Sequence, residues 1–305
     1  MNIFFTCMML AVLVVVVLFA LVVRLVAHIF LGVAVSAPRE DPPNDIDGQE
    51  LFFESSDGLK LHGFFVPGKN TGGRTVVFCH EVGAGGGSWY KYAHFLPEAG
   101  FNVFTFDSRG YGASEKQDHY ETNQWITNYD IYDLQGAIRC LKDRPEVDMN
   151  RLGLFGISRG GGTAICTAAR IGNIKAIATD SVFSTYETLI DYIQRWASVY
   201  LPVKNIPLYA NKFLSTISLA FIQFKLRHKL PRIEKHLDKI ASTPLFFIHG
   251  ERDNHIPIAQ AKRLFKMAKE PKLFWAVKKA RHNEAVIVEP IEYSKKIISF
   301  FDKNL

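Results

Sequence analysis

The sequence predicts an α/β protein: a mostly parallel, twisted sheet with helices on both faces, a helical insertion, and one N-terminal transmembrane helix. Three observations predict this class. Short apolar runs alternate with helical patterns along most of the chain, a glycine-flanked serine stands where one such run meets a helix, and an uncharged apolar run opens the chain. Repeated strand–helix units favour a parallel sheet, because each crossover helix returns the chain to the same edge.

The opening segment is long enough to cross a bilayer. Residues Ile3 to Val23 carry no charge, and a helix over Ile3 to Ala37 would be about 52 Å long, beyond the roughly 30 Å hydrocarbon core. We therefore expect Arg24 near one interface. The alternative is a cleavable signal peptide, but no basic residue precedes the run, and the run is too long for one. Residues 1–37 are predicted to be a retained single-pass anchor.

Basic residues beside the anchor predict its orientation. No lysine or arginine precedes the span, whereas Arg24 and Arg39 follow it, which favours a cytoplasmic catalytic domain. Residues 38–50 are rich in proline and acidic residues and are interpreted as a linker. Residues 51–305 are long enough to build one large core.

Eight apolar runs in this region are expected to be strands: Leu51–Glu54, Leu59–Val66, Thr75–Cys79, Phe101–Phe106, Arg151–Ile157, Lys175–Thr179, Pro244–Ile248 and Lys272–Val277. Helical patterns cover Tyr90–Leu96, Asn128–Lys142, Gly161–Arg170, Ile258–Lys269 and Glu284–Phe301. Asp57-Gly58 between the first two runs is a hairpin signal, so the sheet should open with an antiparallel edge.

The most informative motif is Gly156-Ile157-Ser158-Arg159-Gly160, which reads G-x-S-x-G between a strand and a helix. A serine on such a sharp turn projects its hydroxyl above the sheet, and the flanking glycines permit the turn. The following backbone N–H lies at a helix N-terminus, where it can face an oxyanion. The alternative is a glycine-rich turn with a capping serine.

Two other motifs in the chain fail on their spacing. Gly83 to Gly87 follow a strand, and Asp107 ends the next one, as in a dinucleotide-binding unit. The G-x-G-x-x-G pattern, however, would need glycine or alanine where Ser88 stands. His80-Glu81 could begin the zinc motif H-E-x-x-H, but its fifth position is Ala84. No metal or cofactor is expected, and the four cysteines form neither a metal-binding pattern nor a disulfide framework.

A nucleophilic serine needs a base, and the base needs an orienting acid. In this architecture the chain order is serine, acid, histidine, each on a loop after a strand. Asp253 follows one predicted strand, and His282 follows the last one. Among the ten histidines, only His282 comes after the last strand and after both Ser158 and Asp253; His249, at the end of a strand, is interpreted as structural.

The chain resembles the α/β-hydrolase superfamily, especially its serine aminopeptidase-like and membrane-anchored Bem46-like branches. The matching stretches are His80-Glu81 with the glycines after it, Gly156–Gly160, His249–Pro257, His282 and Asp107-Ser108-Arg109-Gly110-Tyr111-Gly112-Ala113-Ser114. The resemblance covers about Leu51 to Leu305 and implies the α/β-hydrolase fold. It implies Ser158 as nucleophile, Asp253 as orienting acid and His282 as base. Arg109 is expected to brace a loop beside the pocket.

The resemblance also implies an oxyanion hole built from the backbone N–H groups of Arg159 and Val82. The family usually has His-Gly at the end of the strand, where this chain has His80-Glu81. The second donor is therefore left open between Val82 and Glu81, and the acyl pocket is expected to differ in shape.

An insertion at about 183–242 is expected to form a cap. Nine basic and four acidic residues lie between Ser181 and Ser242, which favours an anionic membrane surface over nucleic acid as partner. Four apolar side chains within it recur at helical spacing, namely Phe213, Ile217, Phe221 and Phe224. They fit either a cap helix packed on the core or one that touches lipid.

The sequence thus predicts a serine hydrolase that cleaves an apolar carboxylic ester, thioester or lipid through an acyl-enzyme. A serine peptidase is one alternative, although the insertion has no acidic cluster to bind a free amine. A non-catalytic hydrolase-fold scaffold is the other, although no member of the triad is missing. The acyl length and the oligomeric state are left open.

Overall fold

The computed structural model describes residues 3–32, 48–120, 122–200 and 205–305. Most of the expected linker, residues 38–47, lies outside the described residues. The chain divides into two compact units. The larger one carries the sheet, whereas the smaller one combines α1 (Ile3–Leu31) with α5 (Thr185–Tyr200) and α6 (Leu208–Leu226).

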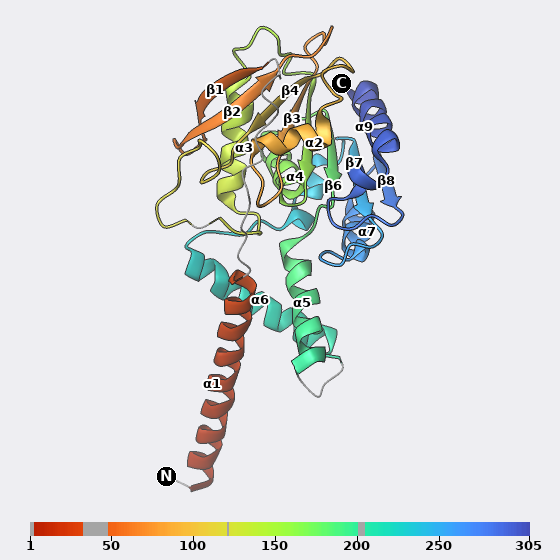
Figure 1. Ribbon diagram of the computed structural model, residues 1–305. Helices are drawn as coiled ribbons and strands as arrows, with labels where there is room; N and C mark the ends of the chain where they lie inside the picture. The colour runs from red at the N-terminus through yellow and green to blue at the C-terminus, as the bar shows by residue number, and fades with distance from the viewer. Residues whose placement is uncertain (1–2, 33–47, 121, 201–204) are drawn as a thin grey trace. The chain divides into compact units, whose positions relative to one another are not determined.

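The larger unit contains one eight-stranded sheet with the order β1-β2-β4-β3-β5-β6-β7-β8 (Figure 1). Its strands are β1 (Gln49–Glu54), β2 (Lys60–Val66), β3 (Thr75–Cys79), β4 (Asn102–Phe106), β5 (Leu152–Ile157), β6 (Ala176–Asp180), β7 (Leu245–Gly250) and β8 (Lys272–Val277). The β1–β2 and β2–β4 pairs are antiparallel, and the remaining pairs are parallel. The expected antiparallel edge and parallel body are confirmed, and strand boundaries agree within two residues.

Helices cover both faces of this sheet because the central strands are apolar on both sides. On β3, Val77 packs into one core cluster and Val76 into the other. The first cluster lies under α3 (Asn128–Cys140), α4 (Arg159–Ile171) and α7 (Ile258–Met267). The second lies under α2 (Trp89–Ala93), α8 (Ala285–Val288) and α9 (Pro290–Asn304). Short 3-10 helices occupy Gly86–Ser88, Ile233–Lys235 and Leu237–Ile240.

The helix expected over Glu284–Phe301 is wrong as a single element, because the structure has two helices there. Helix α8 ends at Val288, and α9 starts with Pro290 as its first residue. Proline lacks an N–H and disfavours helical backbone in the residue before it. Accordingly Glu289 leaves the helical region with φ −133° and ψ 58°.

The smaller unit is held together by specific contacts among its helices. Helix α1 is long and apolar enough to cross a membrane. The Phe19 ring of α1 lies 5.8 Å from the Phe213 ring of α6. Between α5 and α6, the Asn211 side-chain amide donates to the Ile190 carbonyl at 3.0 Å. These contacts fix α5 and α6 to each other, and α6 to α1.

Candidate active site

The backbone around Ser158 forms a tight turn between β5 and α4. Ser158 has φ 51°, a left-handed conformation that side chains rarely adopt. A Cβ at Gly156 would come within 2.4 Å of the Gly160 carbonyl oxygen, and a Cβ at Gly160 within 2.1 Å of the Cys79 oxygen. Only glycine fits at either position, which explains in steric terms why the serine is flanked by two of them.

The structure brings together the three side chains that the sequence singled out. Ser158 Oγ lies 2.9 Å from His282 Nε2, and His282 Nδ1 lies 2.6 Å from Asp253 Oδ2. Each residue follows the carboxyl end of a parallel strand: Ser158 follows β5, Asp253 follows β7 and His282 follows β8. Ser158 and Asp253 are buried, whereas the His282 side chain keeps 19% of its surface exposed.

The carboxylate of Asp253 is held by several donors. Its Oδ1 accepts from the backbone N–H groups of His255 at 2.9 Å and Ile256 at 2.8 Å. Burial raises its pKa, but hydrogen bonds from His249 and His282 lower it more, so the pKa lies well below its ordinary value. Asp253 is therefore ionised at neutral pH and able to orient and stabilise a protonated His282.

His249, interpreted from the sequence as structural, contacts the same carboxylate. This fully buried ring places Nε2 3.3 Å from Asp253 Oδ2 and 2.9 Å from the Ile256 carbonyl oxygen. Its position near the end of an apolar strand gave no signal of this contact, which depends on how the loop after β7 folds back to place Asp253 against the ring. We infer that His249 helps to position Asp253.

Replacing His249 by leucine is expected to lower kcat about tenfold or more, because small displacements of an orienting group are costly in catalysis. His249→Gln keeps an N–H donor and is expected to recover most of the activity with little change in KM. Steady-state kinetics on a p-nitrophenyl ester would measure both variants. If the glutamine variant is as impaired as the leucine variant, His249 acts through packing alone.

The loop that carries His282 is tied to β6, which pairs with the strand that precedes Ser158. Asp180, at the end of β6, accepts hydrogen bonds from Ser181 Oγ at 2.9 Å and from Tyr293 Oη at 3.0 Å. Ser181 Oγ also accepts from the backbone N–H of Asn283 at 3.1 Å. Burial raises the pKa of Asp180. This network fixes the residue directly after His282, although sequence spacing could not reveal it.

A buried histidine organises the loop after β3, where the oxyanion donors are expected. His80 Nδ1 donates to the Glu81 carbonyl at 2.7 Å, while its Nε2 accepts from the Ser108 N–H at 3.2 Å. The Glu81 oxygen is thus turned toward His80, and in a trans peptide the N–H of Val82 points the opposite way. The Glu81 side chain is buried and accepts from Ser88 and Tyr92 hydroxyls, and burial raises its pKa.

His80 makes a testable contribution to pH-dependent stability. Burial, and then the nearby Arg159 charge, lower its pKa from 6.5 to about 4. Above pH 6.5 the His80 ring is neutral in both the folded and the unfolded chain. Between pH 6.5 and pH 4 only the unfolded chain binds a proton at His80. The free energy of unfolding therefore falls as the pH falls. The loss attributable to this group is expected to approach about 3 kcal/mol at pH 4.

The measurement compares the free energy of unfolding of wild type and His80→Gln at pH 7.5 and 4.5. The stability advantage of wild type should shrink at the lower pH, because the glutamine does not titrate. Asp133, whose pKa burial raises to about 6, favours the folded state as pH falls, but it is present in both proteins and cancels. A difference that is the same at both pH values would contradict the assignment.

Arg159 links the turn at Ser158 to the loop that precedes α3. Its buried guanidinium lies 3.3 Å from Asp130 Oδ1 and donates to the Asn123 carbonyl at 3.1 Å. Asp130 also forms a reciprocal N-terminal cap with Thr127 on α3. The side chain of Arg159 therefore stabilises the turn, and its backbone N–H lies at the start of α4, next to Ser158.

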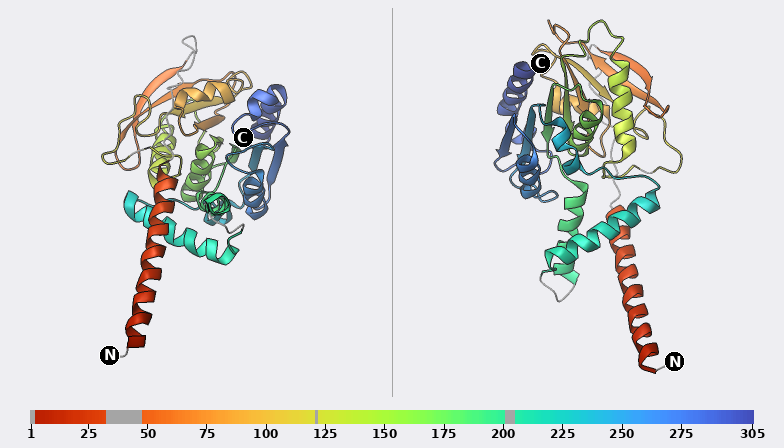
Figure 2. Two further views of the ribbon diagram at one scale, coloured as in Figure 1. Left: turned by 60° about the horizontal axis from the view of Figure 1, so that its bottom comes forward. Right: turned by 180° about the vertical axis from the view of Figure 1, so that it is seen from behind.

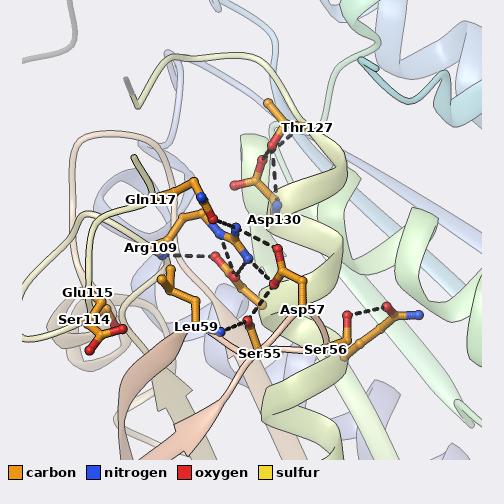
Figure 3. Close-up of polar contacts among 12 residues, drawn as sticks. Ser55, Ser56, Asp57, Leu59, Arg109, Ser114, Glu115, Gln117, Thr127 and Asp130 are labelled. Atoms are coloured by element: carbon orange, nitrogen blue, oxygen red, sulfur yellow. Dashed lines mark hydrogen bonds and ion pairs between the residues drawn. The ribbon is translucent and has the colours of Figure 1, made fainter. Parts of the chain in front are cut away.

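Arg109 braces a second loop through a buried charge network (Figure 3). Its Nη2 donates to Asp133 Oδ1 and to Asp57 Oδ1, both at 2.6 Å, and its backbone N–H donates to Asp133 Oδ2 at 2.9 Å. Figure 3 shows the guanidinium facing Asp57 and Gln117.

The neighbouring Asp107 accepts a hydrogen bond from the backbone N–H of Gly86 at 2.8 Å. The Asp107 carboxylate thus holds the glycine-rich loop at Gly83 to Gly87, which was considered above as a dinucleotide-binding loop.

Among the residues that the structure describes, no group of three or more His, Cys, Asp or Glu side chains could hold a metal ion. The arrangement around Ser158 can instead remove a proton from a hydroxyl and stabilise the cation that results, which is the chemistry of a serine nucleophile.

Comparison with known proteins agrees with the fold. A family model described as the alpha/beta hydrolase fold matches residues 74–201. YfhR of Escherichia coli K12 is 28% identical over 250 residues, which cover 80% of this chain and 76% of YfhR. YuxL of Bacillus subtilis, described as a peptidase, is 27% identical over 84% of this chain but only 39% of YuxL.

A solved structure of the Pyrococcus furiosus esterase Pf2001 has a TM-score of 0.65 and 21% identity, and the match covers 89% of this chain and 98% of the esterase. At that identity the likeness shows the fold. The topology of the sheet and the family match together show that this chain has the α/β-hydrolase fold.

Proposed function

We propose that this protein is a membrane-anchored serine hydrolase that cleaves a carboxylic ester or thioester through an acyl-enzyme intermediate. The observation that supports the proposal most strongly is the hydrogen-bonded series Ser158–His282–Asp253. Its geometry lies within the range for a nucleophile, a base and an orienting acid. The ester-cleaving activity named for Pf2001 is consistent with the proposal.

In the first half of the proposed reaction, His282 Nε2 takes the proton of Ser158 Oγ as Oγ bonds to the acyl carbon. The carbonyl electron pair moves onto oxygen, where the Arg159 N–H and a second N–H stabilise it. His282 then gives its proton to the leaving alkoxide or thiolate as the bond to it breaks. In the second half, His282 takes a proton from a water molecule as that water bonds to the acyl carbon. It then gives this proton to Ser158 Oγ as the bond between Oγ and the acyl carbon breaks and the carboxylic acid leaves.

Val82 is proposed as the second oxyanion donor, with Glu81 as the alternative. The 2.7 Å hydrogen bond between His80 and the Glu81 carbonyl supports Val82, because it fixes the orientation of the peptide group that carries the Val82 N–H. The same bond makes His80 a positioning residue in this proposal.

Helix α1 is proposed to be a retained anchor, with the catalytic domain on the cytoplasmic side. The length and apolar character of α1 support an anchor, and the placement of Arg24 and Arg39 after the span supports the orientation. Residues 51–305 are proposed to form the catalytic domain, with a cap at about 183–242. Protease protection in sealed vesicles would test the orientation.

A panel of substrates tests the proposed reaction class. The p-nitrophenyl esters are expected to be cleaved, with kcat/KM rising about fourfold for each acyl methylene that enters an apolar pocket. Lysophospholipids are tested alongside as lipid esters. Aminoacyl amides are the comparison, because YuxL is described as a peptidase. A higher kcat/KM on the amides would replace the esterase proposal with a peptidase.

A further inference from the structure

Helix α6 departs from the polarity expected for a helix packed against a water-soluble core, because it buries polar side chains and exposes large apolar ones. Its buried positions include three polar side chains, Asn211, Ser215 and Ser218. Its exposed positions include Phe213, exposed by 60%, and Phe224, exposed by 81%. A helix at a water-facing surface turns its apolar side inward, so this pattern indicates that the outer face of α6 meets something apolar.

Most of the exposed apolar side chains of α6 form one continuous stripe. Tyr209, Phe213, Ile217 and Phe224 are all exposed, and with Ala220 they follow one another at intervals of three or four residues. That spacing places them on one face of the helix, over about 22 Å of its length. Contiguous apolar surface of this kind marks an interaction site rather than ordinary exposure.

The contact between α6 and α1 indicates what covers the stripe. Phe213, within the stripe, lies 5.8 Å from Phe19 of α1, ring centre to ring centre. Phe19 precedes Arg24 by five residues, or about 7.5 Å along the helix axis. If Arg24 marks the interface, Phe213 contacts α1 at the depth where interfacial helices lie, roughly 5–10 Å into the boundary between headgroups and acyl chains.

The course and the charge of α6 fit that position. All three views show α6 running across α1 rather than alongside it (Figures 1 and 2). A helix that crosses a membrane span in this way runs along the plane of the bilayer. Its C-terminal end continues into Lys225, Arg227 and Lys229, all exposed, and these cations suit the phosphate groups of a membrane surface.

We propose that α6 is an in-plane membrane helix whose stripe Tyr209, Phe213, Ile217, Ala220 and Phe224 is embedded in the lipid interface beside α1. The inference depends on α1 spanning the bilayer, as proposed above, and it is independent of the ester chemistry. It assigns a lipid-binding role to a segment inserted between β6 and β7 of the hydrolase fold.

Spin-label accessibility in lipid vesicles tests this proposal on the full-length protein. Every variant carries Cys140→Ser. A spin label on native Cys7, which is exposed on α1, then reports on the anchor. Ile217→Cys and Phe224→Cys, each with Cys7→Ser, report on α6. Ile291→Cys in the same background is the matched control, because Ile291 is an apolar side chain of α9 that is 82% exposed.

Oxygen partitions into lipid, whereas a charged or polar nickel chelate stays in water. Labels at 217 and 224 are expected to collide with oxygen severalfold more, relative to the chelate, than the label at 291. Access to the chelate at 217 and 224 equal to that at 291 would overturn the proposal. Low collision with both reagents would overturn it as well, because protein, such as a second copy, would then cover the stripe.

The label at Cys7 distinguishes a failure of the α1 anchor from a failure of the in-plane α6 helix. Protection of Cys7 from the chelate together with access at 217 and 224 would leave the anchor intact and reject the in-plane helix. Access at Cys7 itself would reject both. Neither outcome alters the ester-hydrolysis result, which is measured on the substrate panel.

Discussion

Replacing Ser158 by alanine is expected to lower kcat for ester hydrolysis by at least about 10⁴-fold, because the proposed nucleophile and its proton transfer to His282 are lost together. KM should change little, since the hydroxyl makes its bond only during the reaction. Steady-state kinetics on a p-nitrophenyl ester would measure both. The methyl group of alanine fits the space of the hydroxymethyl, so the folded structure should be retained.

Two variants make this result specific. Ser294→Ala removes a serine of α9 whose Oγ donates to the Ile291 carbonyl at the surface, and it should leave kcat unchanged. Combining Ser158→Ala with His282→Ala should cost little more than either alone, because the two residues act as a unit. Additive losses would contradict the shared role that the 2.9 Å contact between them supports.

The largest expected effect on stability comes from Arg109. Its side chain is 1% exposed, and its partner Asp133 is fully buried. Removing one member of a buried ion pair typically costs about 3–5 kcal/mol, because the other charge stays in a low-dielectric environment. Arg109→Ala should therefore lower Tm by roughly 6–20 °C for a unit of this size, as measured by thermal unfolding in detergent.

The matched control is Arg170→Ala, because Arg170 donates to Asn128 at an exposed position on the surface and should cost less than about 1 kcal/mol. Replacing Arg109 by methionine and Asp133 by leucine together should recover part of the loss, since that pair leaves less unpaired charge buried. An Arg109→Ala variant as stable as Arg170→Ala would contradict the bracing role.

The sheet could be predicted from sequence because its evidence is local. Central strands such as β3 and β5 are short apolar runs, and the glycines around Ser158 mark a turn that no other residue fits. The break at Pro290 was also readable, since proline rarely continues a helix. The Glu284–Phe301 prediction overlooked that signal in favour of the apolar spacing.

The candidate site was predictable in part. The order of Ser158, Asp253 and His282 follows from the strands that precede them. The contact of His249 with Asp253 and the partners of Arg109 depend on how separate loops return to one place: Asp57 lies 52 residues before Arg109. Apolar spacing likewise identified α6, but only the burial of Ser215 beside the exposure of Phe213 distinguishes a lipid-facing helix from a core helix.

Labelling with a fluorophosphonate probe tests the central claim most directly, because the probe reacts with a serine only when a neighbouring base activates it. Wild type is expected to be labelled, Ser158→Ala to remain unlabelled, and Ser294→Ala to be labelled like wild type. Mass spectrometry should place the adduct on the peptide that contains Ser158. Absence of labelling in folded wild type, or equal labelling of Ser158→Ala, would contradict the assignment of Ser158 as an activated nucleophile.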